Sequence, residues 1–159
     1  MIRGVHHVAM ATGDIDRLVA FYRDALGFEV LSRGGWEQGS AAIDGIVGLP
    51  GSAARSAMLR AGNAYIEMFE YSAPAGKPAE QDRPVCDHGY THFCLDVQDI
   101  DVEYERLLGL GMRFHCPPPP ASELRDGSLR ATYGTGSRMA ERSSRISSSS
   151  MTLPSGSRP

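Results

Sequence analysis

Residues 3–11 alternate between the two sides of an extended chain, with His7 on one side and His6 on the other. A period of two predicts a β-strand, and apolar residues on both sides indicate a strand that is covered on both faces. The pattern then changes to apolar residues at three- and four-residue spacing. This spacing predicts a helix that is capped by Asp14 and stopped by Gly27.

The same reasoning assigns elements to the rest of the chain. The first half continues with a strand at 28–32, a Gly-rich stretch at 34–51 containing a short helix at 40–47, and strands at 55–60 and 64–71 joined by a Gly62-Asn63 turn. Residues 72–87 have the Pro- and Gly-rich composition of a linker. A second half repeats the order, with a strand at 89–97, a helix at 100–110 and strands at 112–115 and 129–133.

The two halves also share a motif. The segment His7-Val-Ala-Met-Ala-Thr-Gly-Asp-Ile-Asp16 recurs as His92-Phe-Cys-Leu-Asp-Val-Gln-Asp-Ile-Asp101. We therefore predict an internal duplication with a first module at 1–71, a linker at 72–87 and a second module at 88–134. Two equivalent strands can bring one histidine each into a shared cavity, where neither module alone has enough ligands for a metal ion.

Residues 135–159 break the repeat, because a last strand is due there and nine of these 25 residues are Ser. Such a composition is typical of a disordered tail. Read in a shifted frame, the same codons permit Pro-Asp-Gly-Gly-Thr followed by two apolar residues and a Glu. We therefore hypothesise that this terminus is a frameshift product. AGC or AGT codons in the serine run of the gene would exclude the hypothesis.

Charge and length narrow the function classes. With 159 residues the chain fits one domain or two half-domains that share a core. A net charge of −3 argues against nucleic acid or an anionic membrane as a partner and favours a small-molecule substrate. Met1 leads directly into a strand pattern and no apolar run is long enough to span a membrane, so we expect a cytoplasmic protein. The three cysteines fit reduced thiols better than a disulfide set.

Strand parity predicts the candidate site. It allows the side chains of His7, Glu67 and His92 to face one interior. Two imidazoles and a carboxylate suit Fe, Mn, Co, Ni or Zn(II), and a site with open coordination positions is a reactive one. A lone histidine on a strand is more often a packed or surface residue. However, a buried carboxylate without a partner costs about 1–3 kcal/mol, which favours the metal interpretation.

Other candidate residues carry weaker signals. Neighbours on a strand point to opposite faces, so His6 is not expected in the cavity of His7. The remaining candidates are His88 and His115, which have no ligand-spaced partner, Tyr71, Tyr90 and Cys94, which line either the cavity or the core, and Trp36, expected in the Gly-rich loop. Glu141 lies in the Ser-rich tail and is not expected to be a ligand.

Four stretches resemble the vicinal oxygen chelate superfamily, which includes glyoxalase I, methylmalonyl-CoA epimerase, extradiol dioxygenases and the fosfomycin and bleomycin resistance proteins. They are residues 6–10, 21–28, 65–70 and 92–99, and the resemblance covers residues 3 to 134. It implies an α+β fold of two βαβββ modules that form an open, cupped mixed sheet. The implied metal ligands are His7, Glu67 and His92. The family's fourth ligand, a Glu on the last strand, is absent from this chain, because the second module lacks a recognisable last strand.

The resemblance implies a metal-dependent lyase or isomerase of the glyoxalase or epimerase type, in which Glu67 also serves as the catalytic base. The substrate would be a small carbonyl compound and the intermediate an enediolate or enolate. One alternative is an extradiol-type ring-cleaving dioxygenase. Another is a non-catalytic binding protein of the bleomycin-resistance kind. Related proteins are often dimers, so a homodimer is the assembly that the resemblance implies.

Overall fold

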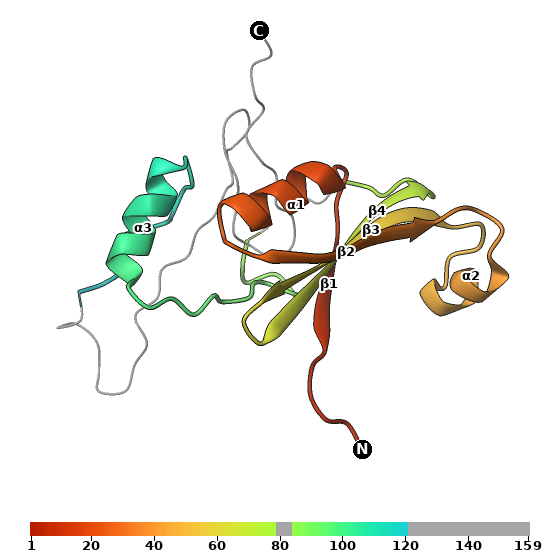
Figure 1. Cartoon of the computed structure of the whole chain (residues 1–159), viewed down its shortest axis with the longest axis horizontal. Helices are drawn as coiled ribbons and strands as arrows, with labels where there is room; N and C mark the ends of the chain where they lie inside the picture. Colours follow the sequence, from red (N-terminus) through yellow and green to blue (C-terminus); the bar gives the residue numbers. More distant parts are fainter. Residues whose placement is uncertain (79–83, 121–159) are drawn as a thin grey trace, which may run out of the picture. The chain divides into compact units, whose positions relative to one another are not determined.

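The computed structural model describes residues 1–78 and 84–120, and the chain divides into two units, Met1–Ala79 and Glu80–Pro159 (Figure 1). The described part of the first unit contains β1 (His7–Ala11), α1 (Ile15–Asp24), β2 (Glu29–Trp36), α2 (Ala41–Val47), β3 (Ala53–Ala61) and β4 (Ala64–Ala73). The described part of the second unit contains α3 (Ile100–Gly109). The protein is therefore α+β, as expected.

The sheet of the first unit has the order β1-β4-β3-β2. β1 pairs in parallel with β4, whereas β3 pairs antiparallel with both β4 and β2. β1 begins only at His7, four residues later than the alternation suggested, because the residues before it have no pairing partner in the described sheet. β2 runs further than expected, to Trp36. Gly35 allows this close pairing, because a Cβ there would lie 2.3 Å from the carbonyl oxygen of Ala54.

α1 packs on one face of this sheet. Its predicted start and stop are confirmed: the Asp14 side chain accepts a hydrogen bond from the Arg17 amide, and Gly27 has a left-handed φ of 72°. The helix buries Leu18, Val19 and Tyr22 together with Leu59, Ile66 and Met68 of the sheet. The core of the first unit therefore lies between α1 and this face.

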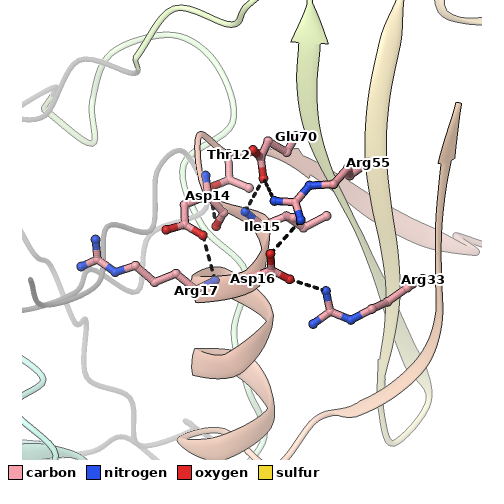
Figure 2. Close-up of polar contacts among 8 residues, drawn as sticks. All are labelled: Thr12, Asp14, Ile15, Asp16, Arg17, Arg33, Arg55 and Glu70. Carbon is pink, nitrogen blue, oxygen red and sulfur yellow. Dashed lines mark hydrogen bonds and ion pairs between the residues drawn. The ribbon is translucent and has the colours of Figure 1, made fainter. Parts of the chain in front are cut away.

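An ion-pair network joins the first turn of α1 to three strands (Figure 2). The Glu70 carboxylate of β4 accepts hydrogen bonds from the Ile15 amide at 2.8 Å and from Arg55 of β3 at 2.6 Å. Arg55 also binds Asp16 of α1 at 2.7 Å, and Arg33 of β2 binds the same carboxylate at 2.6 Å. The two guanidinium groups lower the pKa of Asp16. The network fixes the helix over the sheet at its N-terminal end.

A second polar cluster ties α2 to the start of β3. Ser52 is fully buried, and its hydroxyl donates to Asp44 of α2 at 2.7 Å while accepting from the Trp36 indole nitrogen at 2.9 Å. The same carboxylate accepts from the Gly51 and Ser52 amides. These hydrogen bonds, that of the Ser52 hydroxyl first, lower the pKa of Asp44. The expected short helix at 40–47 is thus anchored by a side chain of its own.

In the second unit, the expected helix is confirmed as α3, which is capped by the Asp99 side chain. The expected strands at 89–97 and 112–115 are not strands in the structure. A strand needs a hydrogen-bonded neighbour, and the partners that the duplication predicts for them, at 129–133 and beyond, lie outside the described residues. The tail at 135–159 lies outside them as well. None of the described helices combines the length and apolar character needed to cross a membrane.

We expect Ser52→Ala to destabilise the protein by about 1–3 kcal/mol, because it removes the buried partner of the Trp36 indole and of Asp44. Urea unfolding followed by tryptophan fluorescence would measure this change. Ser56→Ala, in the neighbouring part of β3, is the matched control and should change stability by less than about 0.5 kcal/mol. Equal stability of the two variants would contradict the role given to the Ser52 hydroxyl.

Acid should destabilise the first unit through Asp16 and Asp44. Their pKa values are lowered in the folded state, so the unfolded chain binds protons first as the pH falls below about 4, and stability is lost in that range. Asp44→Asn should therefore show a smaller loss of urea midpoint between neutral and acidic pH than the unmutated protein. Asp96→Asn, in the second unit, is the control. A pH dependence of Asp44→Asn as steep as that of the control would refute the assignment.

Candidate functional site

The face of the sheet opposite α1, called the site face below, carries the candidate ligands of the first unit. In the parallel ladder of β1 and β4, His7 lies opposite Tyr65 and Ala9 lies opposite Glu67. Ile66 and Met68 point to the helix and are buried, so their neighbours on β4 point to the site face. His7 and Glu67 therefore lie on one face because of strand parity and register together.

His7 and Glu67 meet on the site face. Nε2 of His7 lies 3.2 Å from Oε2 of Glu67, and the two side chains are 36% and 26% exposed. Two ligands bonded to one ion at about 2.1 Å lie about 3.0 Å apart at a right angle and about 3.4 Å apart at the tetrahedral angle. The observed separation fits an ion held by both atoms. It also fits a direct hydrogen bond in which the imidazole donates to the carboxylate.

His6 adjoins this pair, which strand parity did not predict. Its Nδ1 lies 2.9 Å from Nδ1 of His7, and its ring stacks on Tyr65 with centroids 5.3 Å apart and planes 2° apart. His6 was expected outside the cavity of His7, and it is an exposed residue. Its ring nevertheless turns toward His7, because β1 begins at His7 and the alternation of a strand does not extend to the residue before it. A second histidine next to the first was the only sequence signal for this contact.

Aromatic side chains gather along β4 beyond the carboxylate. Trp36 at the end of β2 contacts Phe69 and Tyr71, with ring centroids 5.9 Å and 5.8 Å apart. Trp36 is thus a strand residue, not a loop residue as expected. Phe69 is the next residue after Glu67 that shares its parity, so the aromatic group lies beside the candidate ligand pair.

His92 belongs to the second unit. It is half-buried, and its Nδ1 lies 3.0 Å from the hydroxyl of Thr91. Its convergence with His7 and Glu67 stays a prediction. Among residues 1–78 and 84–120, no group of three or more His, Cys, Asp or Glu side chains is placed to hold a metal ion. Within the described residues the pair on the site face thus supplies two donor atoms, fewer than a protein metal site uses.

The cysteines are not placed near this pair by any described contact. Cys86, Cys94 and Cys116 are exposed, and Tyr90 is exposed as well. Glu141 lies outside the described residues. An imidazole nitrogen and a carboxylate oxygen that converge at a partly exposed position can share a proton or a cation, and this is the chemistry that the first unit offers.

Known proteins show the same fold and family pattern. The pattern of the glyoxalase/bleomycin resistance protein/dioxygenase superfamily matches residues 4–123. A 2-epi-5-epi-valiolone epimerase from Actinomyces sp. is 33% identical over 113 residues, which cover 65% of this chain and 56% of that protein. The chain thus spans little more than half the length of this relative.

Two solved structures are similar at low sequence identity. A glyoxalase family protein from Bacillus cereus superposes with a TM-score of 0.71 at 20% identity, covering 84% of this chain and 87% of that one. A variant of the fosfomycin resistance protein FosX from Listeria monocytogenes, in complex with Mn(II) and 1S,2S-dihydroxypropylphosphonic acid, gives a TM-score of 0.52 at 18% identity and covers 84% of each chain. These likenesses show a shared fold.

Proposed function

Because the chain belongs to the glyoxalase/bleomycin resistance protein/dioxygenase superfamily, we propose that it is a metal-dependent lyase or isomerase of the glyoxalase or epimerase type. Its ligands would be His7, Glu67 and His92, and its substrate a small carbonyl compound. The observation that carries the proposal is the convergence of the His7 and Glu67 donor atoms at 3.2 Å on the face that α1 leaves uncovered. The epimerase that is 33% identical supports the same class of reaction.

The chemistry follows from the two kinds of side chain. A bound divalent ion acts as a Lewis acid that lowers the cost of negative charge on the substrate carbonyl oxygen. Glu67 is partly exposed, so its carboxylate can reach the carbon next to that carbonyl, remove its proton and return it to the same or the neighbouring carbon. His7 would hold the cation through Nε2, the nitrogen that faces the Glu67 carboxylate at 3.2 Å.

Three aromatic side chains lie on one side of the candidate site. Trp36, Phe69 and Tyr71 lie along the same face as Glu67 and present ring edges and faces beyond it. Such surfaces bury the apolar part of a ligand and leave its polar end to the metal and the carboxylate. We therefore expect a substrate with an apolar or ring-shaped body next to its carbonyl group.

Metal binding tests the ligand pair. Protein purified without chelator and then titrated with Mn(II), Co(II), Ni(II) or Zn(II) should bind close to one equivalent. His7→Ala and Glu67→Gln should each weaken binding by about 100-fold or more, since even side chains that only support a ligand commonly contribute about 10–100-fold. Isothermal titration calorimetry and elemental analysis would measure the affinity and the stoichiometry.

Glu70→Gln is the matched control for this experiment. It alters a carboxylate on the same strand that points to α1, so it should lower stability and leave metal affinity unchanged. Equal metal affinity of Glu67→Gln and Glu70→Gln would remove the basis of the proposal. Absence of metal binding in the unmutated chain would favour a non-catalytic binding protein instead.

Proton exchange tests the reaction. With metal bound and D₂O as solvent, the protein should exchange the hydrogen next to the carbonyl group of cyclic hydroxyketones, observed by NMR. Glu67→Gln should slow the exchange by about 10²–10⁴-fold, the usual contribution of a positioned base. The metal-loaded Glu70→Gln protein is again the control.

The same protein preparation distinguishes the dioxygenase alternative from the isomerase proposal. Anaerobic loading with Fe(II), followed by oxygen consumption with a catechol and no proton exchange with any ketone, would show ring cleavage and overturn the isomerase proposal.

Restoring the shifted reading frame at 135–159 should raise metal affinity if a fourth carboxylate completes the site. Unchanged affinity in the restored chain would show that the three proposed ligands suffice.

A further inference from the structure

The second ring nitrogen of His7 has a partner in the preceding residue of the chain. While Nε2 points at Glu67, Nδ1 lies 2.9 Å from Nδ1 of His6, within hydrogen-bond distance. The two rings are nearly perpendicular, at 89°, with centroids 5.2 Å apart. The His7 ring is therefore held at both nitrogens, by an acid on β4 and by its own neighbour in the chain.

His6 is itself held in place, although it precedes the strand. Its ring lies flat against Tyr65, and Tyr65 is the residue that pairs with His7 in the parallel ladder. The backbone pairing of β1 with β4 therefore brings the stacking platform to the position beside His7. An offset stack of this kind restricts the His6 ring to orientations that keep its Nδ1 near His7.

We propose that His6 is a positioning residue for His7, one that fixes the ring orientation of the metal-ligating imidazole through a hydrogen bond at its Nδ1. The inference deepens the proposed function and rests on it. Side chains that hydrogen-bond the free nitrogen of a metal-bound histidine orient the ring and raise its basicity. His6 occupies that place here.

Counting the hydrogens shows why an imidazole suits the role. A neutral imidazole carries one N–H. When Nε2 of His7 donates to Glu67, its Nδ1 must accept from the Nδ1–H of His6. When Nε2 offers its lone pair to a cation, the hydrogen of His7 is on Nδ1 and must be accepted by Nδ1 of His6. The neutral His6 ring can serve as donor in the first arrangement and as acceptor in the second, because its own hydrogen can reside on either nitrogen.

Two substitutions separate hydrogen bonding from packing. His6→Phe keeps a flat ring for the stack on Tyr65 and removes both nitrogens. His6→Asn replaces the ring with an amide that places a donor and an acceptor close to the Nδ1 position. His6 is exposed, so neither change should prevent folding. His88→Phe, which removes a histidine from the second unit, is the matched control.

The affinities for Mn(II), Co(II) and Zn(II) should be measured by calorimetry at about pH 8, above the ordinary imidazole range. We expect His6→Phe to bind about 10–100-fold more weakly, His6→Asn to recover most of that loss, and His88→Phe to be unchanged. Equal affinity of His6→Phe and the unmutated protein would overturn the inference. So would an equal loss in His6→Asn and His6→Phe, because it would assign the effect to packing.

A metal-free measurement separates this inference from the proposed function. Nitrogen NMR of protein labelled in its histidine rings should show the Nδ1 signal of His7 shifted by its hydrogen bond to His6, and His6→Phe should remove that shift. An unmutated chain that bound no metal would refute the proposed function, and the Nδ1 comparison would still decide the role of His6. The same Nδ1 signal in both proteins would refute that role whether or not metal binds.

Discussion

The parallel pairing of β1 with β4 is the constraint on which the rest of the first unit depends. Parallel neighbours require a crossover connection, and α1, β2, α2 and β3 lie in the chain between them. The register places Ala9 opposite Glu67 and His7 opposite Tyr65. A slip of one residue would turn His7 to the helix side, because side chains alternate between the faces of a sheet. The ligand pair thus exists only in this register.

β4 serves both faces of the sheet at once. Its residues of one parity, Ile66, Met68 and Glu70, bury apolar surface against α1 or bind the first turn of that helix. Those of the other parity include Tyr65 and Glu67 and form the candidate site. The bonds of Glu70 to the Ile15 amide and to Arg55 fix the first turn of α1 over the sheet. In this position the helix covers the apolar residues of the core face. Glu67 can then project to the opposite face without having to support the fold.

The site face also shows why a duplicated chain would be needed for metal chemistry. One unit supplies an imidazole and a carboxylate within 3.2 Å, and two ligands are fewer than protein metal sites use. The repeated motif predicts that His92, in the second unit, supplies a third ligand. His6 orients His7 and is not one of the three proposed ligands.

Much of the first unit was determined locally by the sequence. The Asp14 cap, the apolar spacing of α1 and the Gly27 stop depend on residues within a few positions of one another, so pattern and propensity predicted them well. The parity of His7 and Glu67 also followed from the sequence, because alternation along a strand needs no knowledge of its neighbours. The strands expected at 89–97 and 112–115 were wrong, since a strand is defined by a partner that local pattern does not contain.

Only the tertiary structure decided which residues meet. The contact of His6 with His7 depends on where β1 begins and on the Tyr65 ring that the parallel register brings beside it. The binding of Glu70 to Arg55 and to the start of α1 joins positions far apart in the chain, and no local period encodes it. The sequence determined the spacing of apolar residues and the helix caps, because both depend on residues that are near one another in the chain. Register and strand pairing decided the contacts because they depend on the whole sheet.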